Sequence, residues 1–228
     1  MNELLLLIIL LISTIGFLLI VNKNNKLLMN MYIIFIIIIS YILSFRNISF
    51  IGMNINANIV IYSTIIPILY YYIEKNKNIK MKDILTKNII ILVIPMLLIM
   101  LTTGYIPSVT DNNAINIQNT FGINYINLLS YPITLTLSLY IMFKLKEKLK
   151  DIYPNNFYTL IILGSIITAI DLLIYNITTY SLTEKLIDIL FITTVSYIIR
   201  IIIILLYSII IEKNLPKKKV RKWTRFYY

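Results

Sequence analysis

Long apolar stretches separated by short polar ones dominate the pattern of this 228-residue chain. Each stretch is close to the roughly 20 residues that an α-helix needs to cross the hydrocarbon core of a bilayer. The pattern predicts an all-α polytopic membrane protein with about seven transmembrane helices, in a single integral membrane domain over residues 1–228. The predicted helices cover about 4–21, 27–44, 57–73, 88–106, 124–143, 158–178 and 186–211.

Three of these segments carry local signals about how they begin or bend. Segment 57–73 is short and contains Pro67, so we expect it to be kinked or partly re-entrant. Segment 4–21 has the hydropathy of a signal peptide. However, Glu3 stands where a basic residue is expected and no small-residue cleavage site follows, which predicts a retained first helix. A Ser-x-x-Glu capping box at 181–184 marks the start of the last helix.

Basic residues predict the orientation of the chain. Eighteen of the 21 lysines and arginines fall in loops 22–26, 74–87 and 144–157 and in the tail 213–228. Loops 45–56 and 179–185 hold one each, and loop 104–123 holds none. Because basic loops stay in the cytoplasm, this alternation predicts seven helices with the N-terminus outside and the C-terminus cytoplasmic.

The net charge of +11 is therefore mostly the charge of predicted cytoplasmic loops, and it does not indicate a nucleic-acid partner. The basic tail 213–228 directly follows a predicted membrane helix and contains Trp223. We expect it to contact anionic lipid headgroups. The sequence leaves a homodimer open.

Composition excludes several classes of chemistry. The chain is 59% hydrophobic and has neither histidine nor cysteine. It therefore has no disulfide, thiolate nucleophile, Cys/His metal site or His-based triad. It also lacks an ATP-binding GxxxxGK[ST] loop. We expect a protein that is not an enzyme and holds no metal or cofactor, and whose energy, if needed, comes from an ion gradient or a partner protein.

Arg200 is the most informative residue, because no other charge lies between Asp188 and Glu212. It is 12 residues from each of these acids, or about 18 Å along a helix, which predicts a position near the bilayer midplane. A cation at that depth costs at least a few kcal/mol, so Arg200 must face protein, water or an anionic ligand. Tyr197, three residues earlier, shares its helix face, and Ser196 extends the polarity close to that face.

Asp171 is the candidate counter-charge, inside the preceding predicted helix. Counting residues from the outer helix ends places it about 10 Å nearer the outside than Arg200. Two interpretations stay open. Asp171 and Arg200 either form a charge pair that holds their two helices together, or leave between them a space for a polar ligand or a water-lined path. In the second, Arg200 and Tyr197 suit a planar ligand that stacks and accepts hydrogen bonds.

From Gly52 onward the order of several short motifs resembles that of the queuosine-precursor transporter family, also called the VUT family. The motifs here are Gly52 through Ala57-Asn58 to Ile61-Tyr62, Glu74 before a basic loop, Asn119-Thr120-Phe121-Gly122, Phe143-Lys144-Leu145-Lys146-Glu147-Lys148, Thr168-Ala169-Ile170-Asp171-Leu172-Leu173-Ile174-Tyr175, and Ser196-Tyr197-Ile198-Ile199-Arg200. Two departures are Ala169 in place of a glutamine, and Ser138 or Leu139 near the place of an aspartate in the central helix.

The resemblance implies a multi-pass protein of the bacterial inner membrane that imports a small planar nucleobase-like molecule, a deazaguanine or queuine. In this hypothesis the substrate-binding residues are Arg200, Tyr197, Asp171, Ser196 and Thr168, and proton coupling falls to Asp171 or Glu74. Two rivals remain. One is a substrate-binding membrane subunit of an ATP-driven, vitamin-type uptake complex, and the other is a membrane scaffold protein without transport activity.

Overall fold

The computed structural model describes residues 2–50, 52–76, 79–104, 125–180 and 185–215. The predicted capping box of Ser181 and Glu184, the Phe-Gly loop of the family resemblance and the tail beyond 215 lie outside these residues. The described helices are α1 (Asn2–Lys23), α2 (Lys26–Leu43), α3 (Ile59–Lys75), α4 (Met81–Gly104), α6 (Tyr125–Ile152), α7 (Asn156–Tyr180) and α8 (Leu186–Asn214). A two-stranded sheet, β1 (Asn47–Phe50) and β2 (Met53–Asn56), precedes α3.

These described helices match the seven predicted apolar segments, and two of them extend well beyond the prediction. α4 begins at Met81 rather than near residue 88, and α6 continues through the lysine-rich segment to Ile152. Because lysine is a good helix former, a helix can continue through a lysine-rich segment where the apolar pattern has already ended. In α6, Lys146 and Lys150 are buried and form ion pairs with Glu74 of α3, which holds this polar extension against the bundle.

Six of the described helices, all except α3, are long and apolar enough to cross a membrane. Their outward faces carry large exposed apolar side chains, such as Leu4 and Leu11 on α1 and Ile94 on α4. A water-soluble protein rarely exposes so much contiguous apolar surface, whereas lipid tails cover it without cost. The prediction of an all-α multi-pass membrane protein is confirmed at this level.

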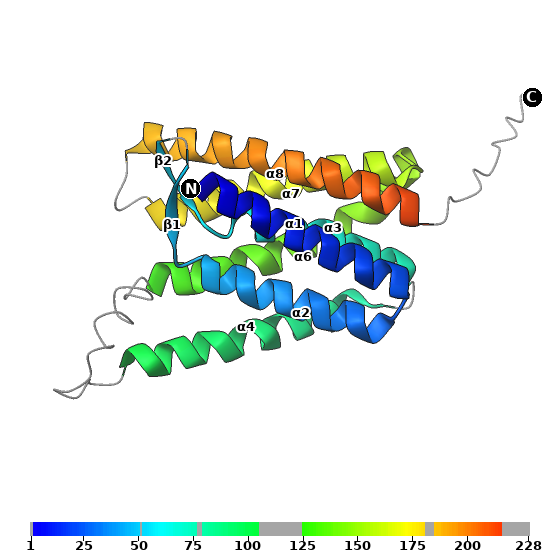
Figure 1. Ribbon diagram of the computed structural model, residues 1–228, viewed down its shortest axis with the longest axis horizontal. Coiled ribbons are helices and arrows are strands. Elements are labelled where there is room, and N and C mark those ends of the chain that lie inside the picture. Colours follow the sequence, from blue (N-terminus) through cyan, green and yellow to red (C-terminus); the bar gives the residue numbers. More distant parts are fainter. Residues whose placement is uncertain (1, 51, 77–78, 105–124, 181–184, 216–228) are drawn as a thin grey trace, which may run out of the picture.

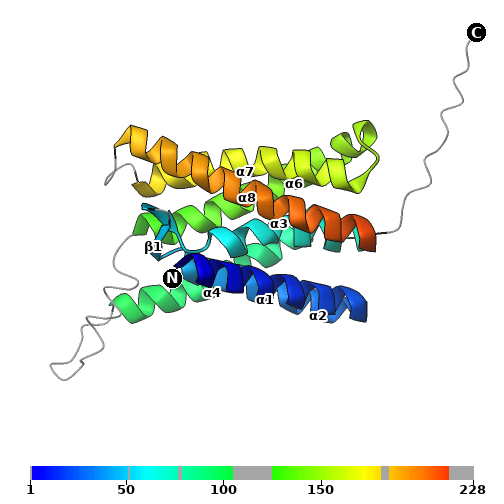
Figure 2. The ribbon, with the colours of Figure 1, turned by 45° about the horizontal axis from the view of Figure 1, so that its top comes forward.

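α3 is the central helix of the bundle. It packs against α1, α2, α7 and α8, and lies between α7–α8 and α1–α2 in Figure 2. Every residue from Ile59 to Ile73 is buried. A helix that is apolar all round and enclosed by other helices does not need a lipid-facing surface, so it tolerates Ser63, Thr64 and a length of 17 residues. The helix runs continuously through Pro67.

Opposite ends of the bundle differ in charge. The turns at 24–25 and 153–155, the start of α4 and the end of α8 lie at one end, and the start of α1, the sheet and the start of α8 lie at the other (Figure 1). Among the described residues, the basic ones of the predicted cytoplasmic loops therefore gather at one end of the molecule, as Lys26, Lys75 and Lys148 do. Which side of a membrane this end faces remains a prediction.

The β-hairpin is a feature that the apolar pattern did not predict. Its strands pair antiparallel with Asn47 opposite Asn56, and Gly52 in the connecting turn has φ +77°, a conformation that favours glycine. Asn56 anchors the hairpin to the bundle, because its amide donates to the Ser44 carbonyl at 2.7 Å and to the Tyr175 hydroxyl at 3.0 Å. The hairpin thereby fixes the entry of the chain into α3.

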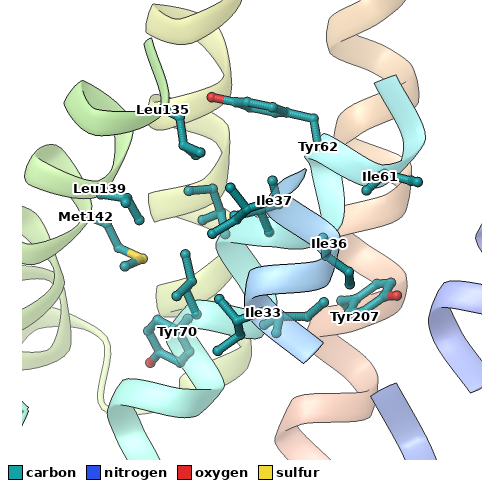
Figure 3. Close-up of a cluster of buried hydrophobic side chains, with 14 of the residues drawn as sticks. Ile33, Ile36, Ile37, Ile61, Tyr62, Tyr70, Leu135, Leu139, Met142 and Tyr207 are labelled. Carbon is teal, nitrogen blue, oxygen red and sulfur yellow. The ribbon is translucent and has the colours of Figure 1, made fainter. Parts of the chain in front are cut away.

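The core is formed where α2, α3, α6 and α8 meet (Figure 3). Close helix approach is visible at Gly164 of α7, where an added Cβ would lie 2.9 Å from Cγ2 of Ile204 on α8. Small residues at such crossings let helix backbones pack tightly in membranes, where apolar burial gives little drive for association. The α7–α8 interface therefore depends on Gly164.

We expect Gly164→Ala to lower the midpoint of thermal unfolding in detergent, by the equivalent of about 1–3 kcal/mol, because the added methyl overpacks this crossing. Ile204→Ala removes the clashing branch, so the double variant should be more stable than the sum of the two single changes predicts. Gly52→Ala tests a different effect, the strained φ of the hairpin turn, and Ile204→Ala should not rescue it. If Gly164→Ala lowered the unfolding midpoint equally with and without Ile204→Ala, the close approach at Gly164 would be contradicted.

Candidate functional site

Asp171 and Arg200 form a direct ion pair between α7 and α8. Arg200 Nη1 lies 2.5 Å from Asp171 Oδ2, and the two residues are 2% and 3% exposed. The predicted axial gap of about 10 Å is therefore closed by the reach of the arginine and the packing of the two helices. The counter-charge predicted for Arg200 is the residue that it contacts.

The second carboxylate oxygen of Asp171 is also engaged. Tyr62 of α3 donates its hydroxyl to Asp171 Oδ1 at 2.5 Å, and Ser138 of α6 donates to the same oxygen at 3.4 Å. Asp171 thus connects α3, α6, α7 and α8 through one carboxylate. Charge-assisted hydrogen bonds of this kind are stronger than those between neutral groups.

Tyr62 also supplies the aromatic face beside Arg200. The guanidinium carbon lies 4.4 Å from the centroid of the Tyr62 ring, within the range of a cation–π contact. The Tyr131 ring meets the Tyr62 ring edge-on, with centroids 5.4 Å apart and an interplanar angle of 81°. Figure 3 shows Tyr62 extending from α3 above the core cluster. One tyrosine therefore holds both members of the ion pair, its hydroxyl on the acid and its ring on the base.

Tyr197, the aromatic neighbour expected from the sequence, is half-buried, and no hydrogen bond or ring contact links it to Arg200 within the described residues. Its predicted role toward a ligand stays a prediction. Ser196 and Thr168 are buried, four residues before Arg200 and three before Asp171. They share the inward faces of α8 and α7 with the ion pair, as their spacing predicts.

Arg200 keeps one donor without a partner. Its Nε is buried and donates to no acceptor among the described residues. A buried N–H that lacks an acceptor costs about 1–3 kcal/mol. The network therefore retains a polar position from which a carbonyl, a carboxylate or water could accept a hydrogen bond.

Glu74 lies in a separate cluster at the lysine-rich end of α3. It is 12 residues from Tyr62, or about 18 Å along the helix. Glu74 Oε1 is 3.1 Å from Lys146 Nζ, and its other oxygen pairs with Lys150. The structure thus separates the two carboxylates that the sequence suggested for proton coupling, and gives Glu74 two lysine partners that favour its ionised form.

A cavity of about 550 Å³ opens beside α3 toward the lysine-rich end, between α2, α3, α4 and α6. Its lining does not include Asp171 or Arg200. Leu139, the residue after Ser138, is part of its lining. With 2% and 3% of their surfaces exposed, Asp171 and Arg200 are closed off in this conformation.

Within the described residues, no group of three or more acidic side chains is arranged to hold a metal ion. Comparisons with protein-family models, with curated proteins and with solved structures found no match.

Sequence reasoning found both charges of the network but missed Tyr62, Ser138 and Tyr131. Tyr62 falls within a stretch that carries the family resemblance, whereas Ser138 was noted only as a departure from it, near the place of an aspartate in the central helix. Their contacts cross from α3 and α6 to α7, and helical periodicity says nothing about partners on other helices. Only the packing of the bundle brings the hydroxyls to Asp171.

Removing one member of the ion pair should destabilise the protein strongly, because the other charge is left buried alone. We expect Arg200→Met and Asp171→Leu each to cost about 3–5 kcal/mol, and the apolar double variant to recover most of that loss. The measurement is the unfolding midpoint of purified protein in detergent. A double variant no more stable than either single variant would show that the charges are not coupled.

Tyr62→Phe keeps the ring over Arg200 and removes only the hydrogen bond to Asp171, so it should cost about 1–3 kcal/mol. Tyr197→Phe is the matched control, because the Tyr197 hydroxyl makes no hydrogen bond to a described residue. We expect the control to unfold at the wild-type midpoint. Similar losses of stability in both variants would argue against a stabilising hydrogen bond from Tyr62 to Asp171.

Proposed function

We propose that the protein is a bacterial inner-membrane importer of a small planar nucleobase-like molecule, of the queuosine-precursor class. The observation that carries the proposal is the buried Asp171–Arg200 pair with the Tyr62 ring on the guanidinium. Charges inside a membrane-spanning bundle are costly and commonly mark a transport path. The motif resemblance supplies the substrate class.

The network supports a switch between closed and open arrangements. Separating Asp171 from Arg200 would leave two buried charges, each several kcal/mol above the paired state. A proton on Asp171, or a ligand that accepts hydrogen bonds from Arg200 and stacks on Tyr62, would offset that cost. In this mechanism Asp171 carries the coupling proton, and Arg200 and Tyr62 bind substrate together with the earlier candidates Tyr197, Ser196 and Thr168.

The proposed orientation has seven spanning helices, the N-terminus outside and the lysine-rich end in the cytoplasm. α3 is the seventh span, shielded from lipid by its neighbours. Because the chain contains no cysteine, single cysteines report on topology without background.

We expect Lys148→Cys, exposed at the lysine-rich end, to resist a membrane-impermeant maleimide in intact cells and to react after permeabilisation. Lys185→Cys, an exposed lysine at the opposite end, is the matched control and should react in intact cells. The positive-inside rule is the physical reason for this difference. The reverse labelling pattern would invert the proposed topology.

The transport proposal is tested by rescue of queuosine-modified tRNA in a precursor-auxotrophic bacterium that lacks its own importer. We expect the wild-type chain to restore the modification when a deazaguanine or queuine is supplied, and Arg200→Ala to abolish rescue while still inserting. Insensitivity to proton uncouplers, or a copurifying ATP-driven complex, would favour the substrate-binding subunit instead.

A scaffold without transport activity is the second candidate, favoured by one observation: Asp171 and Arg200 pair directly with each other, and Tyr62 binds the other oxygen of the acid. The Asp171→Leu/Arg200→Met variant distinguishes a transporter from a scaffold, because it removes the charges and replaces them with apolar side chains that can pack. Transport requires that the folded double variant fail to rescue. Undiminished rescue would assign the pair a structural role alone.

A further inference from the structure

The 550 Å³ cavity between α2, α3, α4 and α6 has the features of a ligand site in its own right. Ligand pockets commonly measure about 300–1,000 Å³ and combine apolar walls with a few polar groups. The inner walls here are apolar, including Ile33, Ile37, Ile91 and Leu139. The lining includes Lys75, Asn76 and Ile79, which lie where the chain passes from α3 to α4, so we place the mouth at that end of the bundle.

The mouth is positively charged. Lys26, Lys75 and Lys87 line it from three different helices, against one acid, Asp83. None of the three lysines forms an ion pair with a described residue. Lys75 donates to the Tyr71 hydroxyl at 2.9 Å and lies 5.2 Å from the centroid of that ring, and neither contact supplies a negative charge. Three cations at one opening attract and hold an anion.

Asn88 supplies a second, independent observation. It lines the cavity from α4 and is 2% exposed. Its amide nitrogen reaches Thr136 Oγ1 at the long distance of 3.5 Å, and its Oδ1 accepts no hydrogen bond from a described residue. A buried acceptor without a donor costs about 1–3 kcal/mol, so a residue kept in that state needs a reason.

We propose that this cavity binds a small amphipathic organic anion that bears an N–H or O–H donor. Its negative charge lies between the lysines of the mouth, its apolar body contacts the isoleucine and leucine walls, and its donor meets Asn88 Oδ1. The site is separate from the Asp171–Arg200 network, and the inference goes beyond the proposed transport function and does not require it.

The position of the site suggests how a bound ligand would affect the Asp171–Arg200 network. Leu139 lines the cavity and directly follows Ser138 in α6, and the Ser138 hydroxyl donates to Asp171. The carbonyl of Ile37, another lining residue, accepts from Tyr131, whose ring packs on Tyr62. A ligand at the inner end therefore contacts residues adjacent to two supports of the ion pair.

The test uses the full chain in phosphatidylcholine nanodiscs and isothermal titration calorimetry with three probes. 2-Aminobenzoate has the charge, the aromatic body and the N–H donor, benzoate lacks the donor, and aniline lacks the charge. We expect 2-aminobenzoate to bind saturably, with benzoate about tenfold weaker, the worth of one hydrogen bond to a buried acceptor. Aniline should also bind more weakly than 2-aminobenzoate.

Asn88→Leu should lower the affinity for 2-aminobenzoate to that for benzoate, and it should leave the affinity for benzoate unchanged. Its unfolding midpoint should equal or exceed that of wild type, because the change removes an unsatisfied buried oxygen, and this separates loss of binding from loss of fold. The double variant Lys26→Gln/Lys87→Gln should lower the affinity for both carboxylates by about fivefold and leave the affinity for aniline unchanged. Lys148→Gln, an exposed lysine at the same end but outside the cavity lining, is the matched control and should change nothing.

Absence of saturable 2-aminobenzoate binding, or binding that neither Asn88→Leu nor the lysine pair affects, would overturn the proposal. A lipid headgroup is the competing source of negative charge. If phosphatidylglycerol in the nanodisc displaces 2-aminobenzoate and the lysine variants lose retention of that lipid, the cavity is a lipid site and the small-anion proposal fails.

Discussion

A buried charge that cannot reach water needs a counter-charge, and this constraint organises the centre of the molecule. Arg200 cannot face lipid at the depth of its helix without a large cost, so α8 must present it to a partner inside the bundle. Asp171 meets it from α7, and Tyr62 and Ser138 complete the coordination of the acid from α3 and α6. Four helices are held in register by one carboxylate.

The central helix makes that arrangement feasible. α3 carries Tyr62 near its start and Glu74 near its end, and it is enclosed by its neighbours along its length. Its two polar anchors differ in character. The first lies in a closed network in the middle of the bundle, and the second pairs with two lysines at the charged end. The chain thereby keeps polar groups in the interior without exposing them to lipid.

The cavity beside α3 contrasts with the closed ion pair. Both carboxylate oxygens of Asp171 have partners in the ion pair, whereas the cavity combines lysines that form no ion pair with a described residue and an acceptor on Asn88 that has no donor. Stability alone explains the first arrangement, because paired buried charges avoid the cost of separate ones. It does not explain the second, since an apolar residue at 88 would remove an unsatisfied group.

Hydropathy and charge are properties of each segment alone, so the amino-acid pattern was enough to predict the helical segments, the alternation of basic loops and the need of Arg200 for an interior partner. The pattern also indicated Asp171, but with an axial gap that packing closes. The central position of α3, the hairpin before it and the place of Tyr62 rather than Tyr197 beside Arg200 follow only from the packing of the bundle. Those outcomes depend on the offset and rotation of one helix against another, which periodicity along a single helix does not record.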